Sequence, residues 1–172
     1  NLIEEWKNDL VLAEALYRKS IENAEKNNDQ QSISYSLEFI GIIKSKLGQN
    51  DSAIYYMNQS LQIRKELNLQ YPLALSYMNI AEVMDRNGNY LGANRNYNKA
   101  LEISSAIQAH EFTNFLYGNL SKLHKKRGNL DSAITYLELQ QALQDSLFNL
   151  QKTKEFAEIK GKYEDALKEE KI

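Results

Sequence analysis

The chain has 172 residues, no cysteine and a formal net charge of −2 at pH 7. A charge so close to zero offers no basic surface for nucleic acid, and we expect no nucleic-acid binding by this segment. Without cysteine, disulfides and thiolate metal sites are excluded, and the longest apolar run, Phe39–Ile43, is too short for us to expect membrane insertion.

The first predicted element is an amphipathic helix over residues 4–27, followed by three helix pairs. The pairs are expected at 31–47 and 50–68, at 72–87 and 90–107, and at 111–127 and 130–144. A last helix is predicted at 147–170, with Asp145 or Ser146 as its N-cap. We divide the chain into a helical array at 1–145 and a C-terminal helix at 146–172.

A period of 40 residues organises these elements. Gly48, Gly88 and Gly128 are 40 residues apart and lie where the first helix of each pair ends, a position that favours glycine. Small residues follow five positions later at Ala53, Ala93 and Ala133, and Ala13 extends the series. The repeating unit is therefore helix–turn–helix. Because the first unit has only its second helix and the chain starts at Asn1, we interpret it as a piece of a longer protein.

The repeats resemble the tetratricopeptide repeat (TPR) family over roughly residues 9–141. The first-helix pattern of a large, an apolar and a small residue is present as Tyr77, Ile80 and Ala81, and as Tyr117, Leu120 and Ser121. The second-helix pattern is present as Ala93, Tyr97 and Ala100, whereas the fourth unit departs from it at Gln140. The resemblance implies an all-α, right-handed TPR superhelix, an α-solenoid of antiparallel helix pairs with 40-residue repeats.

Residues that carry chemistry are scarce. His110 and His124 share no ligand spacing, and no phosphate-binding glycine loop or paired-carboxylate motif occurs. We therefore expect no catalytic residue, no metal site and no cofactor, and we predict that this segment is not an enzyme. A kinase domain of the full-length protein would lie outside it.

In TPR proteins the first helices of the units line a concave groove, and the resemblance places nine residues of this chain there. These are Tyr35, Phe39, Asn79, Glu82, Arg86, Phe115, Asn119, Lys122 and Lys126. We hypothesise that Asn79 and Asn119 hold the backbone of an extended peptide and that Lys122 or Lys126 meets an acidic group. The alternative is that the basic run at 122–127 is a solvated helix end favoured by the helix dipole.

The C-terminal helix carries an apolar stripe of Phe156, Ile159, Tyr163 and Ala166. One interpretation is a cap that covers the last repeat. The other is a partner helix that packs on a second copy, giving a homodimer and leading into an output domain. In both we expect the start of the helix to pack on the preceding helix through Leu147, Leu150 and Phe148.

The segment Asp-Ser-Leu-Phe-Asn at 145–149, with Glu158–Glu164 downstream, resembles the junction in TPR-containing sensor histidine kinases and helix-turn-helix regulators of Bacteroidetes-like bacteria. This resemblance implies the sensor region of a signal-transduction or transcription regulator that binds a protein or peptide. Such a region is periplasmic when it is membrane-anchored and cytoplasmic otherwise. A free-standing TPR adaptor and a cytosolic peptide-pheromone receptor are the alternatives.

Overall fold

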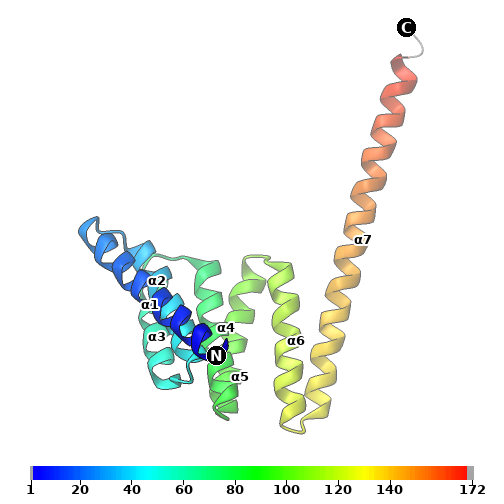
Figure 1. Ribbon diagram of the computed structural model, residues 1–172. Coiled ribbons are helices and arrows are strands. Elements are labelled where there is room, and N and C mark those ends of the chain that lie inside the picture. The colour runs from blue at the N-terminus through cyan, green and yellow to red at the C-terminus, as the bar shows by residue number, and fades with distance from the viewer. Residues whose placement is uncertain (1, 170–172) are drawn as a thin grey trace.

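The computed structural model describes residues 2–169, and the side chains of residues 4–163. This part of the chain forms seven α-helices and no strand, and each helix packs against the next (Figure 1). The helices are α1 (Leu2–Lys26), α2 (Gln30–Lys46), α3 (Asn50–Glu66), α4 (Gln70–Arg86), α5 (Tyr90–Ala106), α6 (His110–Lys126) and α7 (Leu130–Glu169). The predicted all-α solenoid of antiparallel helix pairs is confirmed.

Turns of one kind join these helices. α2 to α6 each contain 17 residues, and each of the six turns has one residue with positive φ. These residues are Asn28, Gly48, Asn68, Gly88, Gln108 and Gly128. The amide that follows each of them donates to the carbonyl five residues earlier, at 2.8 to 3.0 Å, which closes a Schellman motif. The glycine turns are those predicted, whereas the left-handed Asn28, Asn68 and Gln108 are new.

Small side chains let the two helices of a unit approach closely. Ala53 and Ala93 are fully buried, and Ala133 is nearly so. Facing Ala53, a Cβ added at Gly41 would lie 2.7 Å from Met57 Cγ. The alanines of the 40-residue pattern are therefore helix-crossing points, as in the predicted register, and Gly41 faces one of them.

Most predicted helix ends differ from the structure by one or two residues, and two differences have a structural explanation. α4 begins at Gln70, so Pro72 is its third residue and still lies in the first turn, where the missing amide proton has no partner to lose. The break predicted near residue 145 is wrong, because α7 continues without interruption from Leu130 to Glu169. Asp145 and Ser146 are interior residues of α7, so the division of the chain at 145 falls inside a helix and stays a prediction.

The repeat register explains why α7 does not turn. Phe148 occupies the position at which Asn28, Asn68 and Gln108 adopt positive φ. The left-handed conformation is unfavourable because it brings the Cβ close to the following carbonyl oxygen. A polar side chain can offset this cost with a local hydrogen bond, whereas the phenylalanine side chain cannot. The helix therefore continues through the position of the missing turn.

None of the described helices is both long and apolar enough to cross a membrane.

The buried crossing at Ala93 generates a first prediction. Ala93→Leu should lower the free energy of unfolding by about 1–3 kcal/mol, because added methyl groups overpack the crossing. Urea unfolding followed by circular dichroism measures this change, with Ala106→Leu, at an exposed position of the same helix, as the control. Equal midpoints for the two variants would contradict the assigned register.

The left-handed Gln108, with a φ of 55°, generates a second prediction. Gln108→Gly should raise the free energy of unfolding by about 1 kcal/mol, because glycine adopts this conformation without the Cβ clash. Gln108→Ala keeps the Cβ and is the control. If thermal unfolding shows no gain for glycine over alanine, the turn carries no strain at this position.

Candidate functional site

The nine predicted groove residues lie on one face of α2, α4 and α6, which we call the A helices. They occupy positions equivalent to 35, 39, 42 and 46 of the first A helix, and the steps of four and three residues give one helix face. Tyr35, Phe39 and Phe115 are between 37% and 51% exposed, large fractions for aromatic side chains. The A-helix face is thus open and partly apolar.

A small hollow lies on this face between α2 and α4. Its volume is about 180 Å³, and Met57 of α3 is buried beneath it. The surrounding side chains from the A helices are Ile42, Ser45, Lys46, Asn79, Glu82 and Arg86. Three of the predicted site residues, Asn79, Glu82 and Arg86, are brought together here.

Polar contacts between residues 41 positions apart connect neighbouring A helices. Arg86 donates to Ser45 Oγ at 2.5 Å, and Lys126 donates to Asp85 Oδ2 at 2.6 Å. The lysine side chain is 54% exposed, so solvent screens this ion pair and its contribution to stability is small. Lys126 therefore remains available to an acidic ligand, whereas Arg86 forms part of the contact between α2 and α4.

A buried ion pair that the sequence analysis missed lies behind this surface. Arg64 of α3 donates to Glu38 Oε2 at 3.0 Å and to Ser76 Oγ at 2.7 Å, and both ionic side chains are almost fully buried. Burial lowers the pKa of Arg64, opposed by the Glu38 carboxylate and by Tyr35. The equivalent positions in the neighbouring units are occupied by the small residues Ala24 and Ser104. An arginine at a position where the other units have a small residue is the sequence signal that could have revealed this ion pair.

The two predicted ligand-binding amides have different surroundings. Asn79 Nδ2 donates to Glu38 Oε1 at 2.7 Å, so this amide nitrogen is already hydrogen-bonded to the carboxylate of the buried ion pair. In the next unit Met78 replaces Glu38, and Asn119 Nδ2 is buried without an acceptor in the described part of the chain. Asn119 is therefore the better candidate to meet a ligand, and Asn79 is chiefly a structural residue.

Glu82 follows Asn79 by about one turn of α4. Its pKa is raised because partial burial disfavours the charged carboxylate, and the nearby Arg86 opposes this effect while Asp85 adds to it. Burial also raises the pKa of Tyr97, and Glu82 and Asp85 act in the same direction. The middle A helix thus carries the carboxylates Glu82 and Asp85 beside Arg86, and Lys122 and Lys126 follow on α6.

The histidines do not form a site. His124 Nε2 lies 3.1 Å from Asn94 Oδ1, and its ring stacks on Tyr136 with centroids 5.4 Å apart, so it packs between α5 and α7. Burial lowers its pKa, and Arg127 contributes. In the described residues no three His, Cys, Asp or Glu side chains gather as metal ligands would.

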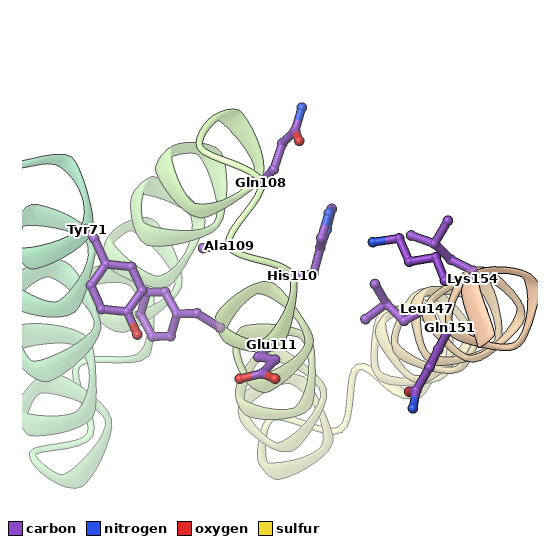
Figure 2. Close-up of a pocket in the computed structure, with 10 residues that line it drawn as sticks. Tyr71, Gln108, Ala109, His110, Glu111, Leu147, Gln151 and Lys154 are labelled. Atoms are coloured by element: carbon purple, nitrogen blue, oxygen red, sulfur yellow. The ribbon is translucent and has the colours of Figure 1, made fainter. Parts of the chain in front are cut away.

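A cavity of about 550 Å³ lies between the first turn of α6 and the middle of α7. Figure 2 shows His110 on one side and Leu147 and Lys154 on the other. The predicted packing of Leu147, Leu150 and Phe148 on the last helix of the array is wrong. All three belong to that same helix: Leu147 and Leu150 line this cavity, and Phe148 is 58% exposed.

The predicted partner-helix residues are open to solvent. Phe156, Ile159 and Tyr163 are between 65% and 70% exposed, and α6 is the helix on which α7 packs. The side chain of Ala166 lies outside the described residues. In Figure 1 this half of α7 extends away from the array.

Two solved structures share the fold. The crystal structure of BtubC (BKLC) from P. vanneervenii matches 83% of this chain with a TM-score of 0.75 and 21% identity. The crystal structure of the apo form of RapI matches 83% with a TM-score of 0.64 and 22% identity. The match spans 58% of BtubC and 50% of RapI. No family model and no curated protein matches the chain. These likenesses show a helical-repeat fold.

The pKa of Glu82 generates a third prediction. Because this pKa is raised in the folded state, the folded protein binds the proton more tightly than the unfolded chain does. The carboxyl therefore destabilises the fold increasingly as pH rises through and above its ordinary pKa of 4.5. Glu82→Gln removes this effect, so its stability advantage over wild type should grow from about pH 4 to about pH 7 in urea unfolding. A stability difference between Glu82→Gln and wild type that does not change with pH would contradict the raised pKa of Glu82.

Proposed function

We propose that this protein is a non-catalytic TPR domain that binds a protein or an extended peptide on its A-helix face. The observation that carries the proposal is the composition of that face, where exposed aromatic side chains on α2 and α6 lie on the same helix face as an amide without an internal acceptor and two lysines on α6. Aromatic and cationic residues on a rigid helical scaffold are typical of recognition surfaces.

The chemistry of the face defines the ligand class. Tyr35 and Phe39 on α2 and Phe115 on α6 would take apolar side chains, and the Asn119 amide would bond the peptide backbone. Lys122 and Lys126 would meet an acidic group. The proposed ligand is therefore a peptide segment that has apolar residues and at least one carboxylate.

We further propose that the chain is the sensor region of a bacterial signal-transduction or transcription regulator. In this proposal α7 associates with a second copy through Phe156, Ile159 and Tyr163, whose exposure supports such a contact. The same A-helix face would also suit a free-standing adaptor or a cytosolic peptide-pheromone receptor. Sequencing the gene beyond the codon for Ile172 separates these contexts.

A fourth prediction tests the binding surface. A fluorescein-labelled library of peptides with aromatic and acidic residues is screened by fluorescence polarisation, and the tightest peptide is kept as the probe. Asn119→Ala should weaken its binding by about 1–2 kcal/mol, roughly 5- to 30-fold in Kd, because one amide contact is lost.

The control is Asn58→Ala, which removes an exposed amide from α3. Circular dichroism of both variants verifies that helix content is unchanged. If the two variants bind the probe equally well, the A-helix face around Asn119 is not the binding surface.

A further inference from the structure

The last helix has an exposed face at positions that, in the preceding units, are covered by the helix that follows. Met57 on α3 and Tyr97 on α5 belong to apolar clusters with the following helix and are 1% and 4% exposed. Leu137 is their equivalent on α7, and it is 52% exposed. We call the surface of Leu130, Ile134 and Leu137 the next-repeat face, because a further unit would pack there.

The apolar stripe of this face continues along the whole of α7. Its members follow one another at steps of four and three residues: Leu130, Ile134, Leu137, Gln141, Asp145, Phe148, Lys152, Phe156, Ile159 and Tyr163. The pattern repeats every 11 residues, a period of 3.67 that keeps the stripe nearly straight on an α-helix. It is about 50 Å long at 1.5 Å per residue. Its seven large apolar residues are each more than half exposed, which indicates an interface.

We propose that a second copy of α7 packs on this stripe in the antiparallel direction, centred near Phe148. The distal half of each α7 then lies on the next-repeat face of the other copy. This direction follows from the array, in which every helix runs antiparallel to the one before it, so the next-repeat face has the shape that receives an antiparallel helix.

The length of the stripe identifies the occupant. A 17-residue helix such as those of the repeats would cover only about half of it. Among residues 2–169 only α7, with 40 residues, is long enough to cover the stripe completely. A second α7 also carries the same apolar pattern, so two copies are self-complementary, as a two-fold interface requires.

The charges of the stripe select the direction. Asp145 and Lys152 are its two charged members, and they lie on either side of Phe148. Antiparallel pairing places Asp145 of one copy opposite Lys152 of the other, whereas parallel pairing places each charge opposite itself, which is unfavourable. Within one copy Asp145 accepts from Gln141 at 2.9 Å, and Lys152 Nζ lies 4.4 Å from the centre of the Phe148 ring. Each charged side chain therefore contacts a neighbouring residue of the stripe.

This arrangement rests on the proposed self-association of α7 and adds its direction and its residues. Its residues are not those of the A-helix face, so it can be tested without a ligand. In the antiparallel dimer the two arrays lie at opposite ends of the helix pair, and each chain closes the open end of the other.

Cysteine cross-linking provides the fifth prediction, because the wild-type chain contains no cysteine. Ile134→Cys and Tyr163→Cys are purified separately, mixed and oxidised. We expect a disulfide between the two variants and little cross-linking of either variant alone. Gly161→Cys, two residues away on the opposite face of α7, is the matched control and should not cross-link with Ile134→Cys.

Sedimentation equilibrium separates the possible failures. A dimer in which Tyr163→Cys cross-links with itself would overturn the antiparallel direction and leave the proposed self-association intact. A monomer at all concentrations would overturn both. The charge pair gives an independent measurement: Asp145→Lys should weaken the dimer about tenfold, and adding Lys152→Asp should restore it. Failure of the second change to restore the dimer would also overturn the antiparallel pairing.

Discussion

A left-handed residue every 20 positions is the constraint on which the rest of the structure depends. Each of the six turns uses the same Schellman hydrogen bonds, so α2 to α6 have equal lengths and residues 40 apart occupy equivalent places. The buried alanines meet their partners, and the exposed faces of α2, α4 and α6 align, only because this spacing is kept. Where Phe148 stands in place of a turn residue, the helix continues and the array stops. One backbone conformation therefore defines both the surface that would bind a ligand and the end of the array.

The buried pair of Arg64 and Glu38 is one place where the repeats are not interchangeable. Removing two charges from water is costly, and their attraction and hydrogen bonds offset that cost without a clear gain in stability. The neighbouring units lack these residues, so the contact that joins α2, α3 and α4 has no equivalent at the same positions of the other described units. The same carboxylate holds Asn79, so the middle of the A-helix face is rigid. Asn119 Nδ2 has no such partner in the described part of the chain.

The sequence predicted most of the fold and only part of the site. The 40-residue period, the three glycine turns and the crossing alanines were enough to define the solenoid, because each is local. The gaps between helices near residues 28, 68 and 108 were predicted, but the left-handed conformation of Asn28, Asn68 and Gln108 was not, since these polar residues are common in helices and loops alike. Near residue 145 the capping residues Asp145 and Ser146 outweighed Phe148 in the prediction, although the repeat register disfavours a turn there. The contact of Asn79 with Glu38 was not predicted, because helix periodicity indicates a face and not the partner across it.

Gln140 explains how the A-helix face and α7 are physically connected. The other units have Ser20, Ser60 or Ala100 at this position, which leaves room for close helix packing. Gln140 instead donates to the Asn114 carbonyl at 3.2 Å, and a Cβ added at Gly118 would lie 3.1 Å from its Nε2. Gly118 precedes Asn119 in the chain, so the side chain of α7 lies directly against the backbone that carries the proposed ligand contact. Because α7 is one continuous helix, Gln140 belongs to the same rigid element as the stripe of the proposed dimer and joins that element to the A-helix face by a direct contact.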